Sequence, residues 1–432
     1  MTPDALTLSR RGVLGGAALL ALAPRLGWAA TAADNRFPNV TAFIEGYVDQ
    51  RKVPGMLATL GFGAAAPTVI ARGTEGFDDR DPQGLDTLYR LYSMTKPVTG
   101  MAAMILIDEG KLGLDQPLAE ILPKFARMQV QVTPDGSITD LRPAKTAITI
   151  RHLLTHTAGL GYTVVQKGPL KAAYEAAGLV PGQVSKIPLP GLGRGTSLTS
   201  LAEFADRLAD MPLVYEPGTR WSYSVALDLM GRVIEVASGL PFDAFLKARL
   251  FDPLGMSSSF FQVPASELHR LATNYGVLAG IPLPIDPATG SIFADKPPFP
   301  MGGAGLVASP RDYDRFLEMI ANYGVLDGKR VMSAKAVALG TSNLLPPGAQ
   351  TKDTFADSAG FGAGGRVGLG EQAGTYGWGG AAGTVALVDM KRAFRAGLYT
   401  QYMPSEAYPV HRDFPNAVLA DLKLMAPARK AA

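Results

Sequence analysis

The chain has 432 residues, 47% of them apolar, and its 41 Lys and Arg against 38 Asp and Glu give a formal charge of +3. This near balance gives no reason to expect a nucleic-acid partner, and the length suggests two or three domains with sizeable cores. Because the chain has no cysteine, it has no disulfide framework, thiolate metal site or cysteine nucleophile.

Residues 1–32 have the pattern of a twin-arginine export signal. Arg10 and Arg11 precede an apolar run that ends at Ala23, and small residues from Ala29 onward offer cleavage sites. The run is about a dozen residues long, against the roughly 20 that a helix needs to cross a bilayer. A short membrane anchor is the alternative. We expect a periplasmic or secreted protein that is exported folded, keeps no membrane anchor and carries a charge of about +1.

Apolar spacing predicts several elements before the first chemically informative segment. The expected elements are a helix over 39–50, a hairpin of strands 56–62 and 68–72, and a short strand over 88–91. Later elements follow in chain order. We expect a short helix within 112–122, surface loop over 134–145, a loop over 161–198 that covers a binding cleft, helices over 201–209, from about 226 to Gly239 and over 241–250, a proline-rich loop over 281–300, a helix over 310–323, strands 385–389 and 396–400, and a closing helix over 418–425.

The segment from Leu91 to Gly100 places Ser93 and Lys96 three residues apart, directly after the expected strand. If a helix begins here, the hydroxyl and the amine share one face and can meet. A serine hydroxyl is a weak nucleophile and needs a neighbouring base, and a lysine amine can be that base when its surroundings disfavour the ammonium. The tetrapeptide alone is unspecific, because a chain of this size contains Ser-x-x-Lys about once by chance.

His152 and His156 have a spacing that can bind a metal ion, but no H-E-x-x-H pattern and no third ligand lies nearby. We therefore interpret both as structural histidines that bond to the backbone and pack in a cleft wall. His269 and His411 stand alone and receive no role. The sequence predicts no metal site.

Tyr223 follows the turn at residues 216–219 and precedes a long amphipathic helix. At the mouth of that helix its hydroxyl can point into a cleft, where an ammonium such as that of Lys96 would let the phenol carry protons. A purely structural tyrosine is the alternative for this segment taken alone.

Two glycine-rich segments follow. Residues 360–365 satisfy G-x-G-x-x-G, but they open no βαβ unit, so we expect turn and strand rather than a nucleotide site. Residues 375–384 include Trp378, Gly379 and Gly380, whose small neighbours allow an edge strand to approach a ligand closely.

Together, Ser93-x-x-Lys96, Tyr223-Ser224 about 130 residues later and Trp378-Gly379-Gly380 resemble the serine β-lactamase and penicillin-binding-protein superfamily. Within it, the chain most resembles class C β-lactamase-like serine hydrolases and family VIII carboxylesterases, over residues from about 36 to about 425. The resemblance implies an α+β fold in which an antiparallel sheet is flanked by helices. Residues 36–92 and 300–428 would build the sheet domain, and 93–299 a mostly helical region with long cleft-covering loops.

The resemblance also implies the roles of the site residues. Ser93 would be the acylated nucleophile, and Lys96 and Tyr223 the proton-relay pair, without deciding which of the two is the base. The backbone N–H groups of Ser93 and Ala381 would form the oxyanion hole, with Trp378, Gly379, Gly380 and Val225 binding the substrate. No metal or organic cofactor is implied, and the oligomeric state stays open.

The departures from the family pattern concern the substrate. Val225 stands where relatives carry a polar side chain, and Trp378 and Gly379 stand where a lysine and a hydroxyl bind a carboxylate. We therefore predict an exported carboxylesterase acting on a small-molecule ester. A β-lactamase or D,D-peptidase is the first alternative, since Arg220 or Arg366 would restore the cation by folding in. Acyl transfer to another alcohol and a non-catalytic binder of cell-wall fragments are the others.

Overall fold

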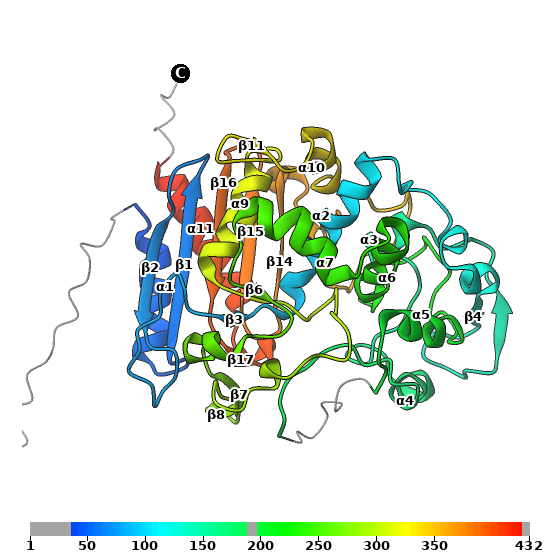
Figure 1. Cartoon of the computed structure of the whole chain (residues 1–432), viewed down its shortest axis with the longest axis horizontal. Helices are drawn as coiled ribbons and strands as arrows, with labels where there is room; N and C mark the ends of the chain where they lie inside the picture. Colours follow the sequence, from blue (N-terminus) through cyan, green and yellow to red (C-terminus); the bar gives the residue numbers. More distant parts are fainter. Residues whose placement is uncertain (1–35, 188–196, 426–432) are drawn as a thin grey trace, which may run out of the picture. The chain divides into compact units, whose positions relative to one another are not determined.

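The computed structural model describes residues 36–187 and 197–425, and the expected export signal lies outside these residues. Within them, an antiparallel sheet of seven strands forms the centre of the fold (Figure 1). In spatial order the strands are β12 (Gly360–Phe361), β13 (Arg366–Val367), β14 (Thr375–Gly379), β15 (Val385–Asp389), β16 (Phe394–Tyr399), β1 (Gly55–Phe62) and β2 (Thr68–Gly73). Strands from both chain ends therefore pair in the middle, where Ala58 of β1 lies opposite Leu398 of β16.

Helices cover both faces of this sheet. On one face, α1 and α11 pack on a core that takes Met56, Ala58 and Leu60 from β1, and on the other α9 packs over Leu57 (Figure 1). This alternation is the period of two expected for a strand buried on both sides. In chain order the helices are α1 (Pro38–Asp49), α2 (Thr95–Asp108), α3 (Ile150–Leu154), α4 (Gly168–Ala176), α5 (Leu201–Ala209), α6 (Ala226–Ser238), α7 (Phe242–Leu246), α8 (Asp252–Leu254), α9 (Pro310–Ala321), α10 (Ala334–Gly340) and α11 (Val410–Met425).

Short strands form small sheets beside the central one. One small sheet brings β3 (Tyr89–Arg90) and β6 (Ser259–Phe260) onto β9 (Val307–Ala308), which fixes the chain just before Ser93. The remaining pairings join β17 (Tyr402–Met403) and β8 (Ile281–Asp286) to β7 (Asn274–Leu278), β4 (Gln129–Gln131) to β5 (Leu141–Pro143), and β10 (Val325–Leu326) to β11 (Lys329–Arg330).

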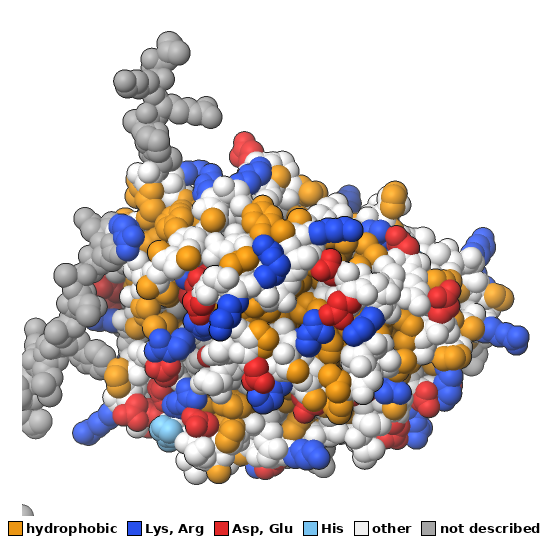
Figure 2. Space-filling view, turned by 45° about the horizontal axis from the view of Figure 1, so that its top comes forward, with side chains coloured by type: hydrophobic (Ala, Val, Ile, Leu, Met, Phe, Trp, Pro, Cys, Tyr) orange, Lys and Arg blue, Asp and Glu red, His pale blue; other side chains and the backbone are white. Residues whose placement is uncertain are grey.

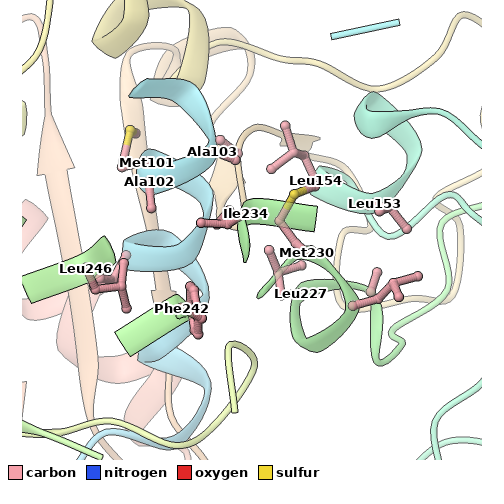
Figure 3. Packing of buried hydrophobic residues seen from close by; sticks show 14 of the residues in the cluster. Met101, Ala102, Ala103, Leu153, Leu154, Leu227, Met230, Ile234, Phe242 and Leu246 are labelled. Atoms are coloured by element: carbon pink, nitrogen blue, oxygen red, sulfur yellow. The ribbon is translucent and has the colours of Figure 1, made fainter. Parts of the chain in front are cut away.

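The core between α2, α3, α6 and α7 positions the chemically informative segments (Figure 3). Its labelled side chains are all apolar and include Met101 and Ala102 from α2, Met230 from α6 and Phe242 from α7. Because α2 carries Lys96 and α6 begins three residues after Tyr223, this packing sets the distance between the two residues. A fully buried side chain of this size contributes about 1.5–3 kcal/mol.

Most predicted elements are confirmed, and four are wrong in part. The expected surface loop over 134–145 contains β5, which pairs with β4. The expected loop over 161–198 contains α4, in which Leu170 and Tyr174 bury one helix face and Pro169 stands in the first turn, where it is tolerated. The expected loop over 281–300 begins with β8. This is an edge strand, which tolerates Pro282 and Pro284 although a proline has no N–H to donate to a neighbouring strand. The closing helix begins at Val410 rather than Val418 and continues through Pro415.

Charge is mixed over the face shown in Figure 2, where Lys and Arg side chains are interspersed with Asp and Glu. No extended basic region is visible on that face. In the described ranges we find no helix with the length and apolar character needed to cross a membrane.

The packing of α2 can be tested with a pair of glycine substitutions. A Cβ added at Gly100 would lie 2.0 Å from the carbonyl oxygen of Ala363, whereas one added at Gly46 in α1 meets nothing within 4 Å. We expect Gly100→Ala to lower the free energy of unfolding by about 1–3 kcal/mol through overpacking, despite the better helix propensity of alanine. Gly46→Ala should raise it by up to about 1 kcal/mol. Denaturant unfolding measures both, and equal effects would contradict the packing described.

Candidate active site

Ser93, Lys96 and Tyr223 lie together, as the sequence predicts. The Ser93 Oγ accepts hydrogen bonds from Lys96 Nζ at 3.1 Å and from the Tyr223 hydroxyl at 2.6 Å. Ser93 and Tyr223 are partly exposed, whereas Lys96 is completely buried. The serine hydroxyl is therefore held between an amine and a phenol.

A sharp backbone turn presents Ser93. Ser93 sits in η1 (Tyr92–Met94), a 3₁₀ turn between β3 and α2, and Tyr92 before it has φ of +44°. This left-handed conformation costs a non-glycine residue roughly 1–3 kcal/mol and persists only where the surroundings enforce it. They do so here, because the Leu91 amide donates to Leu306 O and the buried Tyr92 hydroxyl accepts from Asn274. Tyr92 thus points inward while Ser93 reaches the surface.

Lys96 is held by the loop that precedes β9. Its Nζ donates to the carbonyl oxygen of Gly303 at 2.7 Å and lies 4.6 Å from the ring centroid of Tyr223 and 5.9 Å from that of Tyr162. A buried amine requires such partners, because it has lost its hydration. The amine can turn only slightly without losing its contact with Ser93.

Asp228, which sequence reasoning missed, completes this arrangement from α6. Its Oδ1 accepts from the Gly303 amide at 2.8 Å, and the side chain is 1% exposed. Burial raises the pKa of Asp228 to about 6, although the charge of Lys96 acts in the opposite direction. The sequence signal that could have identified Asp228 is a single acidic residue among the apolar residues of the first turn of α6. Gly303 therefore links the two side chains, because its N–H bonds to the Asp228 carboxyl and its carbonyl oxygen bonds to the Lys96 amine.

The two paired histidines are structural, as interpreted from their spacing. His152 Nδ1 accepts from the Thr149 amide at 3.2 Å, and burial lowers the pKa of His152 to about 4. His156 Nδ1 lies 3.0 Å from Ser224 Oγ, and its ring packs 5.0 Å from that of Tyr223. Burial and the charge of Lys96 lower the pKa of His156, so the ring supports Tyr223 in neutral form. In the described ranges no group of three or more His, Asp and Glu residues is arranged to hold a metal ion.

The turn after β14 packs directly on the backbone that leads to Ser93. A Cβ at Gly380 would lie 2.2 Å from Leu91 O, and Thr384, across the turn, donates to the same carbonyl at 3.4 Å. Among the described residues, the amides of Ser93 and Ala381 donate no hydrogen bond, and both residues are partly exposed. Both N–H groups are therefore available to a substrate oxygen.

Trp378 contributes an aromatic wall beside the hydroxyl pair. Its Nε1 donates to the Tyr223 hydroxyl at 3.4 Å, and Trp221, whose ring lies 6.4 Å from that of Trp378, stacks on Tyr223 at 5.9 Å with an interplanar angle of 11°. Phe355 and Phe361 pack edge-on against these rings. Trp378 and Gly379 are partly exposed and present an apolar surface beside the hydroxyl pair.

Val225 lies differently from the sequence expectation. Its side chain is completely buried in the core, and its amide donates to Gly161 O at 3.2 Å. A buried side chain offers no surface to a ligand. We therefore expect Val225 to affect the substrate only through the position of Tyr223.

The arginines considered as substitute cations are engaged elsewhere. Arg220 lies over the ring of Tyr215 and donates to Lys352 O, and Arg366 donates to Asp357 O on the exposed side of β13. In the part of the chain that the structure describes, Lys96 is the one charged side chain bonded to Ser93. The site therefore has no second cation in contact with its hydroxyl pair.

Comparison with known proteins identifies the family. The β-lactamase family model matches residues 40–420. Esterase EstB from Burkholderia gladioli is 33% identical over 370 residues, 79% of this chain and 84% of EstB. Protein Rv1367c from Mycobacterium tuberculosis (strain H37Rv) is 36% identical over 267 residues, so the match spans 61% of this chain and 62% of that relative.

Solved structures share the fold over most of the chain. EstCE1, described as a hydrolase with promiscuous acyltransferase activity, matches with a TM-score of 0.72 at 26% identity, over 89% of this chain and 99% of EstCE1. A simvastatin synthase variant (LovD6) from Aspergillus terreus has the same TM-score, 0.72, at 22% identity and covers 91% of this chain and 96% of its own. The second likeness shows the fold alone.

The buried carboxyl of Asp228 predicts a pH-dependent stability. Its folded pKa of about 6 exceeds the ordinary 3.8, so the native state binds the proton more tightly. The free energy of unfolding should therefore fall, by roughly 2 kcal/mol relative to Asp228→Asn, as pH rises from 4 to 7. The asparagine oxygen can still accept from Gly303. Urea unfolding of both proteins across this range gives the difference, and a difference independent of pH would contradict the prediction.

Proposed function

The chain belongs to the β-lactamase family of serine hydrolases, and we propose that its reaction is the hydrolysis of carboxylic esters through an acyl-enzyme on Ser93. The observation that carries this proposal is the position of Trp378 against the Tyr223 hydroxyl. An indole occupies the place where an anionic substrate would need a cation, so a neutral ester fits the site better.

The proposed reaction runs in two steps. Ser93 Oγ attacks the ester carbonyl carbon while its proton passes to the Lys96–Tyr223 pair, and the carbonyl oxygen becomes an oxyanion held by the amides of Ser93 and Ala381. The pair returns the proton to the alkoxide, which leaves as an alcohol. Water then attacks the acyl-enzyme by the same route and releases the acid. Each oxyanion donor is worth roughly 3 kcal/mol of transition-state stabilisation.

Relatives support the substrate class. EstB is named an esterase. EstCE1 is described as a hydrolase with promiscuous acyltransferase activity, and acyl transfer differs only in that an alcohol replaces water in the second step. We therefore keep acyl transfer as the second candidate function, and place hydrolysis of β-lactams or D,D-peptides behind both.

Organisation and location complete the proposal. We propose that residues 36–92 and 300–428 form one discontinuous domain, that 93–299 form a mostly helical second region, and that the substrate binds between them. Residues 1–32 would direct export of the folded protein to the periplasm or beyond, which their Arg10-Arg11 pair supports. Loss of export in an Arg10→Lys, Arg11→Lys double variant would support this part.

The nucleophile and the substrate class can be tested together. We expect rapid hydrolysis of p-nitrophenyl butyrate, little opening of a chromogenic cephalosporin, and a transient acyl adduct on Ser93 by intact mass. Ser93→Ala should lower ester turnover by at least a thousandfold while leaving the fold intact. Retention of even a tenth of the activity would overturn the assignment, and rapid cephalosporin opening without ester turnover would favour the β-lactamase alternative.

A substitution at Trp378 tests the reason for the preference. Trp378→Lys should supply the missing cation and raise cephalosporin acylation by about tenfold, because a charged hydrogen bond contributes roughly 1.5–3 kcal/mol. Ester turnover should fall as the apolar wall is lost. Trp378→Phe is the matched control and should keep the ester preference. Unchanged selectivity in the lysine variant would show that Trp378 does not set it.

A further inference from the structure

His411, which has no role in the mechanism above, lies behind the turn that carries Ala381. It is the second residue of α11, on the sheet face opposite α9 (Figure 1). Its Nε2 lies 3.1 Å from the carbonyl oxygen of Gly380, which also accepts from the Gly383 amide at 3.1 Å. The Gly380 carbonyl and the Ala381 N–H belong to one peptide unit. The histidine therefore contacts the back of the group whose front is proposed to bind the oxyanion.

The strand end is shaped to admit this ring. A Cβ added at Gly379 would lie 2.9 Å from His411 Nε2 and 3.0–3.1 Å from two ring carbons. Any larger residue at position 379 would therefore displace the imidazole from Gly380. On the opposite side, Gly380 packs on Leu91 O, so the peptide is clamped between α11 and the chain that leads to Ser93.

We propose that His411 is a positioning residue for the oxyanion hole, holding and polarising the Gly380–Ala381 peptide from the face opposite the substrate. The inference rests on the proposed function, because it presumes that the Ala381 amide receives the substrate oxygen. It assigns His411 no contact with the substrate.

The physical basis is the planarity of the peptide bond. In a trans peptide the C=O and N–H point in opposite directions, so a bond that fixes the Gly380 carbonyl also fixes the direction of the Ala381 N–H. Hydrogen bonds in series polarise one another, and donation to the carbonyl makes the N–H a stronger donor. The benefit is largest when the oxyanion forms, because a group directed at developing charge needs no reorganisation.

The imidazole is suited to this contact. Residue 411 is exposed as a whole, but its ring lies against Gly379 and Gly380, and this burial lowers the pKa of His411. A neutral ring donates from Nε2 to the Gly380 carbonyl when its other nitrogen carries no proton. Glutamine places an N–H at nearly the same distance from the backbone as histidine Nε2, and alanine places none there.

The first experiment compares His411→Gln, His411→Ala and Arg412→Ala. Arg412 is the matched control, since it is the next residue of α11 and its guanidinium pairs with Asp413 at the surface. Pre-steady-state acylation by p-nitrophenyl butyrate and labelling of Ser93 by a fluorophosphonate are followed. We expect His411→Ala to slow both by about tenfold with little change in KM, a part of the hundredfold or more that loss of a whole oxyanion donor costs. The acylation rate of His411→Gln should stay within about threefold of wild type, and that of Arg412→Ala should equal the wild-type rate.

A double-mutant cycle with Gly379→Ala tests the second contact. Gly379→Ala should slow acylation in the wild-type background by displacing His411, and should have a smaller effect in His411→Ala, where the space is free. A structural role without influence on the oxyanion would instead change stability and leave the acylation rate constants intact.

The outcomes separate the two proposals. Equal acylation rates in wild type and His411→Ala, or a glutamine variant no better than alanine, would overturn the role of His411 while leaving ester hydrolysis in place. Fluorophosphonate labelling that depends on His411, in a protein that turns over no ester, would overturn the proposed function alone. A wild-type Ser93 inert to both reagents would contradict both.

Discussion

The complete burial of the Lys96 amine is the constraint around which the site is built. A buried polar group without hydrogen-bond partners costs several kcal/mol, so the surrounding structure must provide partners. Here they are one carbonyl, one hydroxyl, the face of a tyrosine ring and a carboxyl group at one remove. The backbone can come this close because Gly302 and Gly303 lack side chains, and a Cβ at Gly303 would lie 2.4 Å from Asp228 Oδ2.

These partners come from distant parts of the chain, which ties chemistry to the fold. Lys96 belongs to α2, its carbonyl partner to the loop before β9, Tyr223 to the approach to α6, and Trp378 to β14. The α2–α6–α7 core sets the distance between Lys96 and Tyr223 (Figure 3), and the central sheet sets the position of Trp378. A packing change far from Ser93 can therefore move the proton relay without touching it.

Ser93, Lys96 and Tyr223 could be predicted because three short segments occur in a fixed order along the chain, although none of these segments is specific alone. The periodicity of apolar residues also predicts the hairpin, the amphipathic helices and the strands of the sheet. Asp228 and His411 were missed, since their roles depend on contacts between residues far apart in sequence. The buried position of Val225 was missed because helix entry turns the side chain at that point. Proline content concealed β8, whose edge position allows it.

The groups that line this site limit what it can bind. The Lys96 amine is bonded to Ser93 and Gly303, the Asp228 carboxyl lies behind the same loop with a pKa of about 6, and burial favours the neutral form of His156. Under the proposed function, the wall that faces the substrate is the indole of Trp378. An anionic substrate would give up its hydration without gaining a bonded cation, whereas a neutral ester gives up little. Such selectivity against anionic substrates needs no repulsive group in the site, because a desolvated anion without a cationic partner already binds less favourably.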